Sequence, residues 1–508
     1  MLEPKVQLGR IDTALHTRAG LVLCVYSGNL KLDPDITRVL GEDQVSALQR
    51  FSDRRGFTGR AGTLMYIPVH DDHLTLLVGL GEQGKATTES VRIAAATALR
   101  FMRKLHVQDF SLVWPSTRPR GSSQSDLVAA ATQGTILGAY EFDRYRVSTS
   151  HPHLAVTVTL AVRGSLIKLE QTRRTHRVIA EEVNNARDLQ NENADIINPQ
   201  KIVEFAKKQA AESGFDFFAI SGNELKKRGL NILHGVGRAS AWPPALIVLE
   251  YRGNPQSKQR VALVGKGVTF DTGGINLKTT GAGALPHMHM DMSGAATVLS
   301  VLQCASKLKL KTNLVVVLAV AENAIGAESI KPGSVIRAYN GKTVEIANTD
   351  AEGRLILSDA LAYVVKNYRP SMVIDIGTLT GAVIFTFGDQ FAGLVTNHDQ
   401  LSRQLLRASQ KTGEAIWRLP LTDGYRQAVR GKKSDLVNSV VTRPERADGI
   451  QAGAFLEHFT GDTPFAHIDI SGVANRKRAL SYAASGGTGF GVRLLVNFLQ
   501  NSPRSLGK

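Results

Sequence analysis

Cysteine is nearly absent from the 508-residue sequence, which contains only Cys24 and Cys304. Two cysteines cannot form the disulfide framework that stabilises many small secreted proteins. No C-x-x-C pair occurs, so a zinc site built on such a pair is excluded as well. Any metal ion in this protein must therefore be bound by other side chains.

Long apolar runs are also missing. No run of about 18 apolar residues occurs, and the N-terminal sequence MLEPKVQLGRID lacks the basic and then apolar layout of a secretory signal. We therefore expect a cytoplasmic protein with no membrane partner. With 43% hydrophobic and 21% charged residues, the composition is typical of a globular protein with a sizeable core.

Acidic residues are outnumbered by basic ones, and the formal net charge is +16. Such an excess could indicate a surface that binds nucleic acid. The basic residues, however, occur in short clusters without interleaved aromatics, such as Arg118 with Arg120 and Arg173 with Arg174. Clusters of this kind are more often solvated faces. DNA binding is therefore kept as an alternative function, but it is not expected.

The length and the pattern of apolar segments predict two α/β domains, a smaller N-terminal one and a C-terminal catalytic one around a mixed sheet. Residues 1–165 alternate short apolar strands with helices, including a helix over Thr88–Leu105. A long charged segment over 166–195 predicts a connecting helix. Residues 196–508 again alternate apolar strands with helical stretches, so functional residues are expected in the loops at strand ends.

The segment VGLGEQG places Gly79, Gly81 and Gly84 in the G-x-G-x-x-G spacing of a dinucleotide site. That fingerprint also needs an acidic residue at the end of the next strand. Here the strand FSLVW runs into PSTRPR, which offers Arg118 and Arg120 but no carboxylate. We interpret the motif as a tight glycine turn, and a nucleotide-binding oxidoreductase stays a weaker alternative.

The densest group of candidate site residues follows the predicted strands of the second domain. Its members are Lys266, Asp271 and Lys278 in VGKGVTFDTGGINLK, Asp291 in HMHMDMSGAA, and Asp350 and Glu352 in NTDAEGRLILSDA. Four carboxylates at one site repel one another unless cations neutralise them. Two divalent ions would balance them only if Lys266 ligates as the neutral amine. Such ligands suit zinc, manganese, cobalt or magnesium.

These segments resemble the leucyl aminopeptidase family. Residues 348–355, NTDAEGRL, reproduce the family signature in full, and 265–271 with the following Gly-Gly and Lys278 follow a second core motif. Looser similarity runs from residues 186–189 to 466–470. The resemblance therefore covers most of the chain beyond about residue 170, while the first domain matches in layout more than in sequence.

The resemblance implies a dinuclear metal site. Asp271 and Glu352 would bridge the two ions, Lys266 and Asp291 would complete the tightly held ion, and Asp350 would complete the more exchangeable one. Two divalent ions, expected as zinc or manganese, would share and activate a water molecule. Capture of the substrate amine by a metal would explain exopeptidase action, because an internal peptide bond has no free amine.

The resemblance also implies an activity and an assembly. The activity is release of N-terminal residues, leucine-like ones preferred, from peptides, and the assembly is a homohexamer. Lys278 would polarise the scissile carbonyl, and Arg354 would hold a bicarbonate ion that acts as general base.

Two segments depart from the family pattern. The loop from Lys278 to Asp291 is longer than expected and carries His287 and His289. On an extended strand both histidines would share a face with Asp291, which would make them additional ligands or substrate contacts. We expect them instead to be ordinary loop histidines. By resemblance, Met288 is a candidate wall of the substrate pocket. The second departure is the segment SGGTGFG near the C-terminus, which stands where some relatives carry a methionine before the Thr-Gly. It leaves open which substrate residue the pocket prefers.

Overall fold

The computed structural model describes residues 3–15, 20–28, 30–69, 73–147, 155–279, 284–440, 447–479 and 481–501. The chain forms two compact units, Met1–Asn184 with Arg478–Ser485, and Asn185–Lys477 with Gly486–Lys508. Each unit is built from helices around a sheet, and both sheets are mixed. The predicted fold class, two α/β domains, is confirmed.

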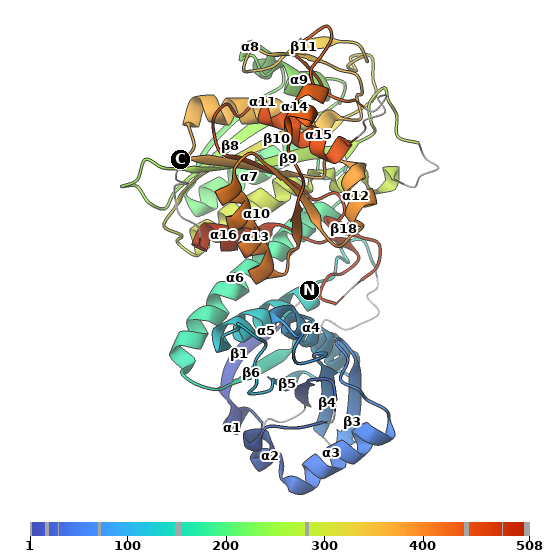
Figure 1. Cartoon of the computed structure of the whole chain (residues 1–508), viewed down its shortest axis with the longest axis vertical. Helices are drawn as coiled ribbons and strands as arrows, with labels where there is room; N and C mark the ends of the chain where they lie inside the picture. The colour runs from blue at the N-terminus through green and yellow to red at the C-terminus, as the bar shows by residue number, and fades with distance from the viewer. Residues whose placement is uncertain are drawn as a thin grey trace. The chain divides into compact units, whose positions relative to one another are not determined.

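The first unit has a six-stranded sheet in the order β1-β6-β5-β2-β4-β3, in which only β3 runs antiparallel to its neighbour (Figure 1). Its strands are β1 (Lys5–Arg10), β2 (Gly20–Val25), β3 (Leu64–Val69), β4 (His73–Gly79), β5 (Asp109–Val113) and β6 (Thr157–Val162). Its helices are α1 (Ile11–Ala14), α2 (Pro34–Leu40), α3 (Glu42–Arg54), α4 (Thr88–Lys104) and α5 (Gln124–Gly138). Helix α4 coincides with the helix predicted over Thr88–Leu105.

The glycine motif of the first unit is a tight turn after β4. A Cβ atom on Gly79 would lie 2.0 Å from the carbonyl oxygen of Arg60, so only glycine permits this approach of two backbones. Gly81 has a φ of 82° and donates its N–H to the Gly59 carbonyl at 3.0 Å. A Cβ on Gly84 would meet nothing within 4 Å. Backbone packing therefore accounts for the first two glycines of the motif.

Helix α6 (Leu166–Asn191) contains the point at which the chain passes from the first unit to the second. The sequence-based boundaries at residues 165 and 195 fall on either side of that point. Residues 478–485 belong to the first unit, where Arg100 donates to the carbonyl of Ser481 and the Arg92 guanidinium lies 5.9 Å from the Tyr482 ring centroid. No feature of the sequence indicates this return.

The second unit has an eight-stranded sheet in the order β15-β14-β17-β13-β9-β10-β8-β7. Its strands are β7 (Asp216–Ser221), β8 (Ala245–Arg252), β9 (Val261–Asp271), β10 (Asn313–Asn323), β13 (Met372–Gly377), β14 (Ala392–Thr396), β15 (Ile416–Arg418) and β17 (Phe465–Asp469). The four central strands, β17, β13, β9 and β10, are parallel to one another. Their carboxyl ends therefore meet at one edge, where open α/β sheets bind ligands.

Helices cover both faces of this sheet (Figure 1). They are α7 (Pro199–Ser213), α10 (Ser293–Lys307), α13 (Asp399–Thr412) and α16 (Val492–Asn501) on one face and α9 (Asn231–Gly237), α11 (Glu352–Tyr368) and α15 (Asp448–Glu457) on the other. Successive β9 residues point to opposite faces: a Cβ on Gly265 would touch Ala295 of α10, whereas Val264 packs in the same core cluster as Ile356 of α11.

Shorter elements complete the second unit. They are α8 (Asn223–Lys227), the 3-10 helix η2 (Leu285–Met292), α12 (Gly381–Phe387), α14 (Asp423–Ala428), a sheet of β11 (Val335–Arg337), β12 (Thr343–Glu345) and β16 (Leu436–Val437), and a pair of β18 (Asn475–Arg476) and β19 (Gly486–Gly487). Within the described ranges, no helix has the length and apolar character that crossing a membrane needs.

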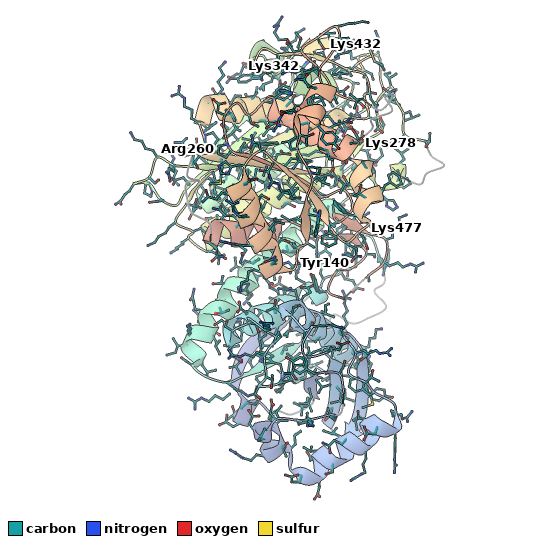
Figure 2. The ribbon with its side chains drawn as sticks, in the orientation of Figure 1. Tyr140, Arg260, Lys278, Lys342, Lys432 and Lys477 are labelled. Atoms are coloured by element: carbon teal, nitrogen blue, oxygen red, sulfur yellow. The ribbon has the colours of Figure 1, made fainter. Side chains whose placement is uncertain are left out.

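The basic residues Arg260 and Lys477 lie in different regions of the second unit, away from Lys342 and Lys432 (Figure 2).

The glycine turn yields a stability prediction. Gly79→Ala is expected to lower the unfolding free energy by about 1–3 kcal/mol, because the added methyl group overlaps the Arg60 carbonyl. Gly84→Ala, the matched control in the same motif, should change it by less than about 0.5 kcal/mol. Urea unfolding followed by circular dichroism measures both values. Equal destabilisation by the two variants would contradict the tight-turn interpretation.

Candidate metal centre

Three segments bring the predicted ligands to the carboxyl edge of the central strands. Strand β9 carries Lys266 within it and Asp271 as its last residue. Asp291 lies in η2, directly before α10. Asp350 lies in the loop before α11, and Glu352 is the first residue of that helix. All five residues therefore converge on one cavity, as the sequence motifs predict.

Glycines make the room that the Lys266 side chain occupies. A Cβ on Gly377 would lie 2.7 Å from Cβ of Lys266, and a Cβ on Gly353 would lie 2.6 Å from its Cε. The aliphatic stem therefore runs between β13 and the first turn of α11. Any larger residue at either position would displace the lysine from the carboxylates.

Lys266 lies buried in a ring of acceptors. Its Nζ is 2.7 Å from Oδ2 of Asp291 and 2.8 Å from Oε1 of Glu352, and it donates to the carbonyl of Thr378 at 2.6 Å. Burial opposes the charge on this amine, but the surrounding carboxylates outweigh burial and raise the pKa of Lys266. Without a metal ion the amine is therefore an ammonium, and it must lose a proton to become a ligand.

Lys278 reaches the same centre from the other side of a glycine turn. Gly273 and Gly274 have φ values of 88° and 63°, and they return the chain toward the centre. The Lys278 Nζ lies 2.8 Å from Oδ2 of Asp271 and 2.5 Å from Oδ1 of Asp350. This lysine is part-buried and lines the cavity, so its charge faces the space in which a substrate would bind.

The centre carries more negative than positive charge. Carboxylate oxygens of Asp271, Asp350 and Glu352 lie within 4.8 Å of one another. With Asp291, four carboxylates face two lysines, which leaves two negative charges uncompensated. Burial, together with repulsion from Asp271 and Glu352, raises the pKa of Asp350 to about 7. Burial likewise raises the pKa of Asp291.

The donor set fits divalent cations. Oδ2 of Asp291 is buried and accepts no hydrogen bond of normal geometry, although Lys266 Nζ lies 2.7 Å from it. A buried carboxylate oxygen that accepts no hydrogen bond has a lone pair available to bind a cation. Together the four carboxylates and one amine offer the oxygen-rich donor set that zinc, manganese or magnesium accept.

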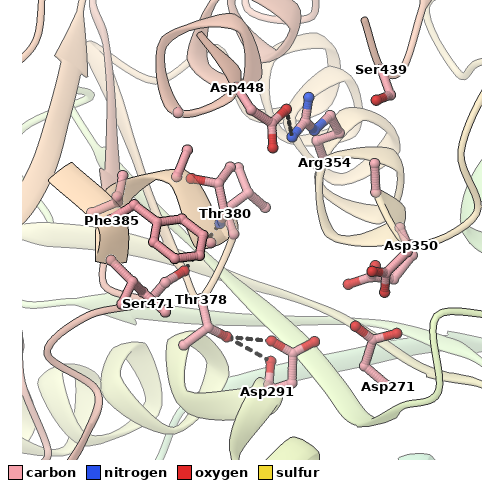
Figure 3. A pocket seen from close by; sticks show the side chains of 18 of the residues that line it. Asp271, Asp291, Asp350, Arg354, Thr378, Thr380, Phe385, Ser439, Asp448 and Ser471 are labelled. Atoms are coloured by element: carbon pink, nitrogen blue, oxygen red, sulfur yellow. Dashed lines mark hydrogen bonds and ion pairs between the residues drawn. The ribbon is translucent and has the colours of Figure 1, made fainter. Parts of the chain in front are cut away.

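Neighbouring polar groups orient the carboxylates. Asn323, the last residue of β10, donates from Nδ2 to Oδ1 of Asp271 at 2.8 Å. The hydroxyl of Thr378 donates to Oδ1 of Asp291 at 2.5 Å (Figure 3). Such partners fix ligand geometry. Asn323 was not predicted, although it ends an apolar strand just as Asp271 does.

Arg354 lies in the first turn of α11, two residues after Glu352, and its side chain is only 2% exposed. It donates from Nη1 to the carbonyl of Asn438 at 3.0 Å. Its Nη2 lies 2.7 Å from Oδ1 of Asp448 (Figure 3). Asp448 was not predicted, because it comes from a segment without a sequence motif and meets Arg354 only in the folded protein.

The cavity at this edge has a volume of about 840 Å³. Its polar lining includes the four carboxylates of the candidate metal centre, both lysines, Arg354 and Asp448. Its apolar lining consists of Ala284, Met288, Met290, Ala351, Leu379, Leu419, Ala447, Ile450 and residues 381–385. This combination can bind a ligand that has a charged group and an apolar side chain.

The extended strand on which His287 and His289 would share a face with Asp291 is not formed. The segment is a 3-10 helix and not a strand, so residues three apart lie on one side. Met288 and Asp291 have this spacing, and both line the cavity. The two histidines do not line it, and Nδ1 of His289 lies 3.2 Å from the carbonyl of Pro286.

The chain is similar to known proteins in both structure and sequence. The bottromycin maturation enzyme BotP superposes with a TM-score of 0.82 at 32% identity, covering 95% of this chain and 99% of that chain. Its complex with Mn gives a TM-score of 0.83, again at 32% identity, covering 95% and 98%. Models of the catalytic and N-terminal domains of the cytosol aminopeptidase family match residues 184–496 and 22–149.

The fold and the domain matches define the class, which is that of the two-domain aminopeptidases, a group of hydrolases. The chain belongs to the cytosol aminopeptidase family. A probable cytosol aminopeptidase of Syntrophotalea carbinolica is 36% identical over 480 residues, 92% of this chain and 95% of the relative. One of Aquifex aeolicus is 34% identical over 503 residues, 98% and 99% of the two chains. The family resemblance read from the motifs is confirmed.

Binding of metal ions should stabilise the folded protein. At one hundred times the dissociation constant, a bound ion contributes about 2.7 kcal/mol to the unfolding free energy. Glu352→Ala should remove most of this metal-induced gain, because Glu352 belongs to the close carboxylate group. Thermal unfolding of metal-free protein with and without added Mn²⁺ or Zn²⁺ measures the effect. Glu204→Ala, an exposed carboxylate of α7, is the control; an undiminished gain in the Glu352 variant would refute the assignment.

Proposed function

We propose that this protein is a metal-dependent aminopeptidase that removes single residues, leucine-like ones preferred, from the N-termini of peptides. One observation carries the proposal: a five-residue ligand set, Lys278 and Arg354 line one cavity that also has an apolar wall. Family membership supports the aminopeptidase activity, and the metal dependence and the residue preference are our extension of it.

Lys266, Asp271, Asp291, Asp350 and Glu352 would hold two divalent ions, with zinc or manganese as the proposed metals. Glu352 pairs with Lys266 and Asp271 pairs with Lys278, and carboxylate oxygens of the two acidic residues lie within 4.8 Å of each other. This closeness supports the bridging role that the family resemblance implies for both. When bound, such ions act as Lewis acids toward the substrate amine and carbonyl and lower the pKa of water. The manganese complex of the structurally similar BotP is consistent with this choice.

The chain's own residues supply the remaining functions. The Lys278 ammonium, which faces the cavity, would stabilise the negative charge that develops on the carbonyl oxygen during attack. Arg354 would hold the anionic general base, for which the family resemblance implies bicarbonate. Burial fixes the Arg354 guanidinium, so an anion held there keeps its position during the reaction.

The apolar wall supports the preference for leucine-like residues. Met288 and Met290 of η2 lie on it together with Ile384 of α12 and Ile450 of α15. Methionine and isoleucine side chains accommodate branched aliphatic groups and offer no partner for a charged one. Peptides are therefore the proposed substrates, and the homohexamer implied by the resemblance stays a prediction.

Dependence on a free amine tests the exopeptidase assignment. The metal-loaded protein should hydrolyse a leucyl peptide and leave the same peptide with an acetylated N-terminus intact, because the acetyl group removes the amine that the metals bind. A chelator should abolish hydrolysis, and added Mn²⁺ or Zn²⁺ should restore it. Product analysis by mass spectrometry measures both effects. Cleavage of the acetylated peptide at internal bonds would contradict the proposal.

The role of Arg354 is tested by kinetics. Arg354→Ala should lower kcat more than it raises KM, because the arginine holds the base and not the substrate amine. A general base typically accounts for about 100-fold or more in rate. Steady-state kinetics on a leucyl substrate, with metal content measured in parallel, gives both constants. A defect confined to KM would overturn this role.

A further inference from the structure

The Arg354 side chain already has an anionic partner within the protein. Its Nη2 lies 2.7 Å from Oδ1 of Asp448, and its Nη1 is bonded to the carbonyl of Asn438. A buried guanidinium needs such compensation, since an unpaired charge at 2% exposure is costly. The place that the family resemblance gives to bicarbonate is therefore next to a carboxylate of this chain.

Asp448 is the remaining base on the cavity wall. The carboxylates that line the described part of the cavity are the four of the metal centre and Asp448. Histidine is absent from this lining, and both lysines there are paired with carboxylates. Of the described lining residues, Asp448 thus has the one carboxylate that can accept a proton without serving as a metal ligand.

The position of Asp448 suits this task. It is the first residue of α15, a ten-residue helix whose N-terminal dipole stabilises a carboxylate. Its side chain is 19% exposed and lines the cavity, so it is held by Arg354 and still reached by solvent and ligand. Only Oδ1 bonds to Arg354, and Oδ2 has no partner among the residues that the structure describes.

We propose that Asp448 is the general base of peptide hydrolysis and occupies, on Arg354, the place of bicarbonate. This inference rests on the proposed aminopeptidase function. The Asp448 carboxylate accepts one proton from a water molecule as the water oxygen bonds to the carbonyl carbon. That proton passes to the amide nitrogen as the C–N bond breaks. Asp448 returns to its ionised form, and the free amino acid and the shortened peptide leave.

Two variants of Asp448 separate the loss of the base from the loss of the anion. Asp448→Ala removes the carboxylate and opens the place on Arg354, so kcat should fall about 100-fold or more. Added bicarbonate or formate should restore much of it. Asp448→Asn keeps the shape of the side chain and its contact with Arg354 but cannot act as a base. Its kcat should fall by the same factor, and added bicarbonate or formate should not restore it. Glu457→Ala is the control, because Glu457 lies on the same helix as Asp448, pairs with Arg426 of α14 and does not line the cavity.

A binding measurement gives a readout that does not depend on activity. Thermal unfolding of each protein with increasing bicarbonate or formate should show an anion-dependent rise in Tm for Asp448→Ala. The unmodified protein, the Asp448→Asn variant and the Glu457→Ala control should show no such rise. The metal content of the unmodified protein and of the three variants, measured on the same samples, must be equal.

The outcomes are distinguishable. An unmodified protein without aminopeptidase activity would overturn the proposed function itself. An active unmodified protein whose activity and Tm rise with bicarbonate, or an Asp448→Ala variant with normal kcat and normal metal content, would overturn the inference about Asp448 alone. Loss of kcat in both variants, with anion rescue and anion-induced stabilisation only in Asp448→Ala, would support it.

Discussion

The excess of buried negative charge at the carboxyl edge of the central strands is the constraint on which the rest of the catalytic unit depends. Carboxylate oxygens of Asp271, Asp350 and Glu352 lie within 4.8 Å of one another, and Asp291 shares Lys266 with Glu352, so the negative charges of the four residues repel one another. Two lysines compensate half of this charge in the protein itself. The remaining charge favours divalent ions, and in the proposed function their binding would be coupled to release of the Lys266 proton.

The packing around the centre serves this charge arrangement. Gly353 and Gly377 leave room for the Lys266 stem, and parallel pairing of β9 with β13 and β10 brings the strand ends together. Asn323 then orients Asp271 from the neighbouring strand. Two glycines and the buried Asn323 amide thus position the candidate ligands within the protein itself.

Charge pairing extends beyond the candidate metal ligands to the proposed base. Arg354 follows Glu352 on the same helix, so the element that carries a candidate metal ligand also positions the guanidinium. Asp448, at the start of α15, meets that guanidinium from another helix. If a carboxylate of the chain replaces a bound anion in this way, hydrolysis no longer depends on the supply of bicarbonate.

The sequence by itself determined the two-domain α/β class, the helix α4 and the convergence of the metal-site residues, because apolar periodicity and short motifs are local properties of the chain. It could not determine that residues 478–485 join the first unit, or that η2 is a 3-10 helix that turns Met288 and not His287 toward the cavity. The pairing of Arg354 with Asp448 was equally hidden. These features arise from contacts between segments far apart in sequence, so only the tertiary structure decided them.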